Sequence, residues 1–372
     1  MAEVTLAGIT KRYGEAVAVC GVDLTVADGE FVTLLGPSGC GKTTTLHMVA
    51  GLIGPTSGVI TIGGRTVADG ARGVFVPPNK RNLGMVFQSY ALWPHMTLRD
   101  NVSYPLKLRH VPAKERARRV ADALGLVALD GLAGRYPHEL SGGQQQRGAL
   151  ARALVGMPDI LLLDEPLSNL DAKLREELRA EIHRVQREVG TTVLFVTHDQ
   201  DEAMALSDRV AVMRAGAIEQ VGAPHVIYEQ PATAFVAAFV GTVNLLDAVA
   251  DGGVARAAAV PALILPVAPP ADAFHAVVRP EDIALVADAD TPLGTVASRT
   301  YHGDHAVYLV LVGPLTLRAT TPKTMEIEPG ADIGVIIHRA TALPTVQTVG
   351  KETGAIRGAS PIQVHDAPRA VY

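Results

Sequence analysis

A glycine-rich segment, Gly36-Pro-Ser-Gly-Cys-Gly-Lys-Thr43, has the residue types and spacing of a loop that binds phosphate groups. It follows the apolar run 31–35 and precedes a run of helical character. Glycines let backbone N–H groups turn toward phosphate oxygens, and the N-terminus of the next helix adds partial positive charge. In this pattern Lys42 reaches the β- and γ-phosphates, and Thr43 supplies a hydroxyl to Mg²⁺.

The whole loop is expected to contact the phosphates of a nucleotide. A chance glycine-rich turn could match the same letters, but the preceding strand and the following helix favour the phosphate loop. Cys40 inside the loop is interpreted as a small filler rather than a reactive thiol. The residues expected to line the phosphates are Gly36, Ser38, Gly39, Cys40, Gly41, Lys42, Thr43 and Thr44.

Two adjacent carboxylates follow a second apolar run, 160–163. Asp164 and Glu165 would then lie at the carboxyl end of a buried strand, where open α/β sheets gather their ligands. Asp164 is expected to hold Mg²⁺, and Glu165 to orient or deprotonate an attacking water. Taken alone, such a pair could simply begin a surface loop. The phosphate loop 121 residues upstream of Asp164 favours the catalytic interpretation.

Two further motifs complete a composite signature. Leu140-Ser-Gly-Gly-Gln144 stands 23 residues before Asp164, and His198 follows the apolar run 193–197. With the phosphate loop and the carboxylate pair, these motifs resemble the ATP-binding subunit of ATP-binding-cassette (ABC) transporters. The resemblance covers residues 3–240 almost continuously and is looser beyond. A plain P-loop kinase is excluded by the Ser141 motif.

The resemblance implies roles for single residues. Tyr13 is similar to the aromatic residue that stacks on adenine. Gln88 resembles a glutamine that touches Mg²⁺ and the attacking water and responds to the membrane partner. His198 resembles the residue that contacts the γ-phosphate. The implied catalytic set is Glu165, His198 and Gln88, and the implied metal set is Thr43, Gln88 and Asp164.

The resemblance also implies that ATP lies between two copies of the chain. Ser141 and Gly143 would bind the γ-phosphate of ATP held by the second copy, and a helix beginning near Gly142 would aim its positive end there. Asp171 resembles a residue that communicates across the dimer. The remaining residue of this nucleotide-binding set is Gln144.

The elements that must position these residues alternate in type up to about residue 235. Apolar runs at 31–35, 160–163 and 193–197 predict buried strands, and apolar spacing of three and four predicts a helix over 172–189 that ends at Gly190. Helical spacing over 112–124 indicates a helical subdomain at roughly 90–155. The fold class is α/β, a P-loop NTPase of the ABC cassette type over residues 1–240.

The sequence pattern changes near residue 241: helical periodicity ends, and short predicted strands separated by turn residues follow. Residues 241–372 are predicted to form a C-terminal β-barrel domain of dimerisation or regulatory type. Val278-Arg-Pro-Glu-Asp-Ile283 and the stretch 296–309 resemble the TOBE-like domain of bacterial import ATPases. As bare chemistry, the Arg279–Asp282 segment could be only a salt-bridged turn.

Composition sets limits on class and location. The 372 residues suggest two domains at about 150 residues each; they are 48% apolar and 19% charged, with a formal net charge of −5. Only two cysteines occur, which favours a reducing cytosol. The longest charge-free apolar stretch, 257–271, is interrupted by prolines and is shorter than the roughly 20 residues of a transmembrane helix. The chain is expected at the cytoplasmic face of the cell membrane, as a peripheral subunit.

We therefore expect an ATP-hydrolysing subunit that powers solute import, as a homodimer bound to two transmembrane permease subunits. An extracytoplasmic solute-binding protein acts indirectly, nucleic acid is not a partner, and ATP and Mg²⁺ are the cofactors. The solute is polyamine or ferric iron. The alternatives are a sugar importer, or a non-transport ABC ATPase that acts on a macromolecular partner.

The sequence does not decide the role of two features, Gly148 and the run 88–96. Gly148 lies inside the helix after the Ser141 motif, where the resembled family has an apolar residue, and the sequence gives no reason for it. The run 88–96 concentrates Tyr90, Leu92, Trp93 and Met96. These side chains either fill the core of the helical subdomain or line a groove for a helix of the membrane subunit.

Overall fold

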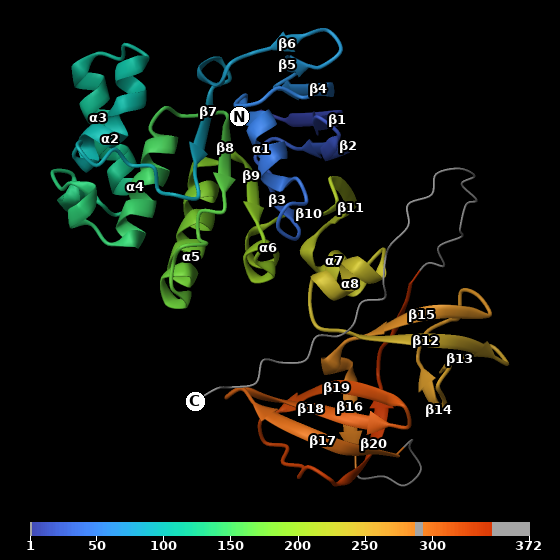
Figure 1. Cartoon of the computed structure of the whole chain (residues 1–372). Coiled ribbons are helices and arrows are strands. Elements are labelled where there is room, and N and C mark those ends of the chain that lie inside the picture. Colours follow the sequence, from blue (N-terminus) through green and yellow to red (C-terminus); the bar gives the residue numbers. More distant parts are fainter. Residues whose placement is uncertain (1, 287–292, 344–372) are drawn as a thin grey trace.

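The computed structural model describes residues 2–286 and 293–343 (Figure 1). A six-stranded central sheet has the strand order β11-β10-β3-β9-β8-β7, and all its pairings are parallel except β10 with β11. Every residue of β3, β8 and β9 is buried, as expected of parallel strands covered on both faces. The strands are β3 (Phe31–Leu35), β7 (Leu83–Val86), β8 (Ile160–Asp164), β9 (Thr192–Thr197), β10 (Arg209–Arg214) and β11 (Ala217–Gly222).

A second, antiparallel sheet covers one side of the first, in the order β2-β1-β4-β5-β6. Helix α1 (Lys42–Ala50) contributes Leu46, Met48 and Val49 to an apolar core shared with both sheets. The phosphate-loop helix is therefore fixed by packing on two sides. The strands are β1 (Val4–Tyr13), β2 (Ala16–Val26), β4 (Ser57–Ile62), β5 (Arg65–Asp69) and β6 (Val74–Phe75).

Arg81 fastens the carboxyl end of α1. Its buried guanidinium donates to the carbonyl oxygens of Met48 and Val49, both at 2.8 Å, and also to Val76 O at 2.6 Å and Val67 O at 3.2 Å. Burial lowers the pKa of Arg81 to about 10, so the side chain stays charged at neutral pH. One side chain thus satisfies carbonyls of the helix end and of β5.

Three helices are inserted between β7 and β8, within the range of roughly 90–155 for which a helical subdomain is predicted, and are called the helical unit below (Figure 1). They share an apolar core with α5, whose observed bounds equal the predicted 172–189 and which ends at Gly190 with a left-handed φ of 70°. The helix predicted over 112–124 is α3. The helices are α2 (Leu98–Leu108), α3 (Ala113–Leu126), α4 (Gly142–Leu154) and α5 (Ala172–Val189).

Close packing between α2 and α4 explains Gly148. A Cβ at this position would lie 2.6 Å from Leu98 Cδ1 and 3.5 Å from Leu92 Cδ1, and the Leu98 side chain is fully buried. Glycine in a helix interior costs about 1 kcal/mol relative to alanine. The departure from the family pattern is therefore a packing requirement of this chain.

The remaining helices lead to a strand-rich C-terminal unit, as predicted. Two five-stranded antiparallel sheets, β14-β13-β12-β15-β21 and β16-β20-β17-β18-β19, share one core that includes Tyr308. The helices are α6 (Gln200–Leu206), α7 (Pro224–Glu229) and α8 (Ala234–Phe239). The strands are β12 (Asn244–Asp251), β13 (Val254–Ala257), β14 (Val260–Leu265), β15 (Ala273–Val278), β16 (Ile283–Val286), β17 (Leu293–Tyr301), β18 (His305–Val312), β19 (Leu315–Pro322), β20 (Asp332–Ile337) and β21 (Thr341–Ala342).

We propose that the domain boundary lies at residues 240/241, as the change of sequence pattern predicts. The proposal is supported by the end of α8 at Phe239 and the start of β12 at Asn244. Residues 344–372 of the predicted C-terminal domain lie outside the described part of the chain. Within 2–286 and 293–343, no helix combines the length and apolar character needed to span a bilayer.

The Arg279–Asp282 segment joins the C-terminal unit to α7 and α8. The buried Arg279 guanidinium donates to the carbonyl oxygens of Tyr228 (2.8 Å), Ala237 (3.1 Å) and Thr242 (3.2 Å), and it lies 3.9 Å from the Tyr228 ring centroid. The Tyr228 hydroxyl in turn donates to Glu281 at 2.6 Å. The motif is therefore an interdomain tie rather than only a salt-bridged turn.

Alanine at position 148 tests the packing account. We expect Gly148→Ala to lower the free energy of unfolding by about 1 kcal/mol, because overpacking typically costs 1–3 kcal/mol and exceeds the helix-propensity gain of about 1 kcal/mol. In a Leu98→Val background, which removes Cδ1, the same change becomes neutral or stabilising. Urea unfolding of the parent, the two single variants and the double variant measures this change of sign. Equal stabilisation by Gly148→Ala in both backgrounds would contradict the packing account.

Candidate functional site

The pairing of three parallel strands brings the predicted residues to one edge of the central sheet. Leu35 at the end of β3 pairs with Thr197 at the end of β9, and Asp164 at the end of β8 pairs with Val196. The phosphate loop and His198 follow directly after β3 and β9, and the carboxylate pair is formed by the last residue of β8 and the residue after it. The sheet therefore gathers three motifs that lie far apart in the sequence.

The loop after β3 closes around the Lys42 side chain. Lys42 is 4% exposed, and its ammonium group donates to Gly36 O at 2.6 Å and Pro37 O at 3.0 Å. Gly41 has a φ of 103°, and a Cβ there would lie 2.5 Å from Ala18 O, so only glycine fits. The loop thus holds a buried cation against its own carbonyls, at the N-terminus of α1.

Cys40 is a buried part of the same loop. Its Sγ lies 3.9 Å from Lys42 Nζ, and burial raises the pKa of the thiol. A thiol with a raised pKa is a weak nucleophile at neutral pH. This environment agrees with the interpretation of Cys40 as a small filler.

Asp164 connects β8 to the phosphate loop. The Thr43 hydroxyl donates to Asp164 Oδ1 at 3.2 Å, and His47 Nε2 lies 3.3 Å from Oδ2. Burial raises the pKa of Asp164 above its usual range, and His47 and Thr43 oppose that shift. A desolvated carboxylate beside a threonine hydroxyl is a fitting oxygen site for a divalent cation.

No group of three or more His, Cys, Asp and Glu side chains placed for a metal occurs in residues 2–286 and 293–343. Mg²⁺ does not need such a cage, because proteins commonly hold it with one or two carboxylates plus substrate phosphates. The Thr43–Asp164 pair next to a phosphate loop fits that mode of binding.

The side chains of His198 and Gln88 both approach the Glu165 carboxylate. Its Oε2 lies 3.1 Å from His198 Nδ1 and 3.4 Å from Gln88 Nε2. The residue has a left-handed φ of 43°, and its N–H donates to Val196 O at 2.9 Å. Non-glycine residues with such φ values cluster at functional sites. The structure therefore brings together the three predicted catalytic residues.

The aromatic run that begins after Gln88 is mostly occupied inside the fold. Tyr90 and Leu92 are half-buried and pack against the core of the helical unit. Trp93 lies with its ring centroid 4.5 Å from that of Tyr104 and 4.9 Å from the Arg152 guanidinium carbon. The core interpretation therefore holds for Tyr90 and Leu92.

Other predicted nucleotide-binding residues lie away from this loop. Ser141 caps the N-terminus of α4: its Oγ accepts from Gln144 N at 3.4 Å, and Gln144 Oε1 accepts from Ser141 N at 3.0 Å. Asp171 caps α5 by accepting from Leu174 N at 3.0 Å. No hydrogen bond among the described residues joins the loop to Ser141, Gly142, Gly143, Gln144 or Asp171.

Tyr13 is likewise free to meet a ligand. It ends β1 with 52% of its surface exposed, and the Lys11 ammonium group lies 5.1 Å from its ring centroid. An exposed aromatic face at a strand end is a suitable platform for stacking.

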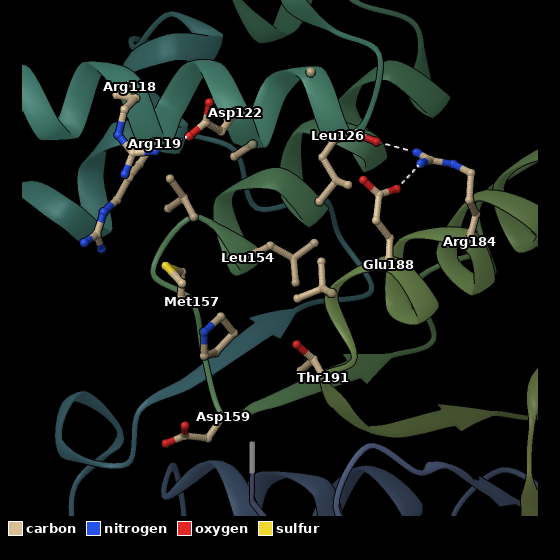
Figure 2. A pocket seen from close by; sticks show the side chains of 15 residues that line it. Arg118, Arg119, Asp122, Leu126, Leu154, Met157, Asp159, Arg184, Glu188 and Thr191 are labelled. Atoms are coloured by element: carbon tan, nitrogen blue, oxygen red, sulfur yellow. Dashed lines mark hydrogen bonds and ion pairs between the residues drawn. The ribbon is translucent and has the colours of Figure 1, made fainter.

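A hollow of about 760 Å³ lies at the opposite edge of the sheet and is not the nucleotide site (Figure 2). Asp159 and Thr191, which line it, precede β8 and β9 rather than follow them. Figure 2 shows Leu126, Leu154 and Met157 around it, with Arg184 bonded to Leu126 O and to Glu188. Paired charges around an apolar wall do not suit a triphosphate.

Sequence reasoning missed three polar residues of the site. His47 lies four residues after Thr43 on α1, so the i,i+4 spacing could have placed both side chains on one helix face. Ser168 Oγ lies 3.4 Å from Gln88 Nε2, and Asn169 donates to Gln88 O at 3.1 Å. No local pattern identifies these last two, because their partner is about 80 residues away.

Comparison with known proteins gives two family matches. A model described as ABC transporter matches residues 19–168, and one described as TOBE domain matches residues 276–343. The chain is 55% identical over 251 residues to the trehalose/maltose import ATP-binding protein MalK of Thermococcus litoralis, covering 67% of this chain and 68% of that protein.

Two further relatives match over more of the chain. The spermidine/putrescine import ATP-binding protein PotA of Acidothermus cellulolyticus is 48% identical, covering 86% of each chain. The Fe(3+) ions import ATP-binding protein FbpC 1 of Rhizobium meliloti is 47% identical, covering 86% of this chain and 93% of its own. Among solved structures, the dimeric cassette MJ0796 bound to ADP and Pi is 34% identical with a TM-score of 0.52, covering 59% of this chain and 98% of its own.

Removal of the Lys42 ammonium group tests the phosphate loop. We expect Lys42→Ala to weaken ATP binding about 10- to 100-fold, because a hydrogen bond from a charged group contributes about 1.5–3 kcal/mol. Lys80→Ala, an exposed lysine outside the loop, is the matched control and should bind ATP as the parent does. Titration calorimetry measures both, and parental affinity in Lys42→Ala would contradict the assignment.

Proposed function

The chain belongs to the ABC transporter family as an import ATP-binding subunit, and from that premise we propose which of its residues bind ATP, hydrolyse it and meet the partners. Binding and hydrolysis of ATP are the activity of this family, so the open questions concern single residues, the dimer and the solute. The observation that carries the proposal is the convergence of Gln88 and His198 on Glu165 at the edge of the sheet occupied by the phosphate loop.

Lys42 binds the β- and γ-phosphates in this proposal. In the structure its ammonium group donates to the carbonyl oxygens of Gly36 and Pro37 and to Cys40 Sγ, all within the loop, so phosphate oxygens can replace these acceptors without moving α1. Backbone N–H groups of residues 38–44 and the N-terminus of α1 add positive potential. Tyr13 stacks on the adenine ring.

Glu165 acts on the attacking water. Its carboxylate accepts or orients the water proton while the water oxygen attacks the γ-phosphorus and the bond to the β-phosphate oxygen breaks. His198 contacts the γ-phosphate, and Gln88, which bonds to the same Glu165 oxygen as His198, helps to orient the water. Thr43, Gln88 and Asp164 would hold Mg²⁺, which neutralises phosphate charge when bound.

Glutamine at position 165 separates binding from hydrolysis. We expect Glu165→Gln to bind ATP with parental affinity and to lose at least about 100-fold in kcat, because the amide keeps the shape but cannot accept the proton. The variant should accumulate as an ATP-bound dimer on size exclusion. Glu188→Gln, an exposed carboxylate at the end of α5, is the control. Near-parental turnover in Glu165→Gln would remove Glu165 from the reaction.

We propose that ATP lies between two copies, with the loop of one copy facing the Ser141 segment of the other. The N-terminus of α4, with Ser141, Gly142, Gly143 and Gln144, makes no hydrogen bond to the loop of its own chain among the described residues. A helix N-terminus is a ready anion site, so it can complete the phosphate shell of a second copy. The dimeric cassette MJ0796 with ADP and Pi supports this arrangement.

Mixing two inactive variants tests the shared site. Lys42→Ala damages the loop face and Ser141→Arg blocks the opposite face, so a mixed dimer carries both lesions in one site and leaves the other intact. Random pairing should therefore restore nucleotide occlusion to about a quarter of the parental level. The Lys42→Ala/Ser141→Arg double variant mixed with an equal amount of parent is the control: its mixed dimers have no intact site, so about a quarter of the parental level should remain in parent homodimers, whereas copies that each formed a whole site would retain about a half. Absence of recovery in the first mixture would contradict sharing.

The import role implies further partners, which we propose are two transmembrane permease subunits, with an extracytoplasmic solute-binding protein acting through them. The subunit would then lie at the cytoplasmic face of the membrane. Gln88 begins the segment proposed to meet the permease. Its neighbours Ser89 and Ala91 are exposed and so accessible to a short helix of the permease, while Tyr90 and Leu92 hold the segment in place by packing against the core of the helical unit.

We propose that the solute is a polyamine or ferric iron, with a sugar as the alternative. The matches to PotA and FbpC 1 each span 86% of this chain, and that to MalK spans 67%. The longer matches extend into the C-terminal unit, which supports the first two classes. Uptake of labelled spermidine, ferric citrate and maltose, compared between cells with the parent chain and with Glu165→Gln, decides among them.

A further inference from the structure

Arg175 lies in the first turn of α5 and bonds to two separate loops of the site. One terminal nitrogen donates to Asp199 Oδ2 at 3.2 Å, in the loop after β9. The other donates to Leu170 O at 3.2 Å, in the loop before α5. The two loops carry His198 and Asp171, which lie next to these acceptors in the sequence. A single guanidinium thus spans the space between them.

The loop that carries His198 is held on both sides of that residue. Asp199 N donates to the Thr197 hydroxyl at 3.0 Å, and Asp199 Oδ1 accepts from Glu202 N at 3.1 Å, which caps α6. Thr197 Oγ1 in turn donates to Glu202 Oε2 at 2.5 Å. His198 itself is 54% exposed in its side chain, so its position depends on the backbone of this loop.

Glu202 gives Arg175 a second anionic partner. The carboxylate is 3% exposed, and its Oε1 lies 3.8 Å from Arg175 Nε. Burial raises the pKa of Glu202, and the nearby guanidinium opposes that shift. A buried carboxylate is costly without a cation beside it. The guanidinium therefore favours one arrangement of α6 relative to α5.

We propose that Arg175 is a positioning residue that couples the loop of Asp171 to the loop of His198. The proposal rests on the roles proposed above for these two residues. When a second copy contacts the Asp171 loop, the shared guanidinium transmits the displacement of Leu170 to Asp199 and so to His198. Closure of the dimer and placement of His198 on the γ-phosphate are then one event.

The network is separable from the fold of its elements. The buried residues of α5 are Leu178, Ile182, Val185 and Gln186, and all of them lie beyond the first turn. Asp199 continues to cap α6 without Arg175, because it uses its other oxygen for the cap. Removal of the guanidinium should therefore uncouple two loops while both helices persist.

Kinetics of the full chain give the first test. We expect Arg175→Ala to lower kcat for ATP about 10- to 100-fold with KM within about twofold, because a small misplacement of a catalytic group costs up to about 100-fold. The kcat of Arg175→Lys should lie between those of the parent and Arg175→Ala, because an ammonium group lacks the fixed fork of donors that reaches both acceptors. Arg179→Ala, one turn further along α5, should match the parent, because within the described part of the chain the ion pair of Arg179 is with Glu176 of the same helix.

Hydrogen–deuterium exchange without nucleotide gives a readout that does not depend on turnover. Arg175→Ala and Asp199→Asn should each raise amide exchange in both 168–171 and 198–203, and the double variant should raise it no further. Arg179→Ala should leave both segments unchanged. This result stands even where Glu165→Gln retains hydrolysis, so failure of the proposed function and failure of the coupling are distinguishable.

Three outcomes overturn the coupling. The first is exchange that rises in only one of the two segments. The second is a fully additive effect of Arg175→Ala and Asp199→Asn on kcat. The third is a KM that rises in proportion to the loss of kcat, which indicates general damage to the nucleotide site. Where Arg175→Ala fails to fold, Arg175→Lys and Asp199→Asn are scored by the same three criteria.

Discussion

The site depends on the register of three parallel strands. Because β3, β9 and β8 pair side by side, the residues that follow Leu35, Thr197 and Leu163 meet at one edge. These strands are buried along their whole length, so a shift of register would expose apolar side chains or bury the polar ones that follow. The burial of apolar Val, Leu and Phe side chains in these strands thus determines the positions of Lys42, Asp164 and His198.

Local patterns predicted this frame well, since each signal lies within a few residues. The apolar runs and the spacing over 172–189 depend only on neighbours along the chain, as do the phosphate loop and the start of α4 near Gly142. Contacts between distant segments were not predictable in this way. The clash of a side chain at Gly148 with Leu98, and the carbonyls bound by Arg279, become visible only when separate elements are placed together.

Arginine side chains recur at the junctions of this molecule; Arg152 and Arg279 are buried, and Arg175 is half-buried. Arg152 bonds to Ala91 O, and Arg279 binds three carbonyls between α7 and β12. Arg175 spans two loops at the nucleotide edge. The guanidinium has five N–H donors in a plane and remains charged when buried, so it satisfies several carbonyls where secondary structures end. The units are therefore joined by directional bonds in addition to apolar contact.

The charge of Arg81 acts electrostatically at distances beyond its own hydrogen bonds. Arg81 fixes a positive charge at the carboxyl end of α1, about 13 Å from the first turn of this nine-residue helix. At an effective dielectric constant of 20, a unit charge at that distance changes the energy of a unit anion by on the order of 1 kcal/mol. The guanidinium also offsets the negative pole of the helix, leaving its positive pole less opposed. The electric field felt by a triphosphate is thus set partly by a residue that never touches it.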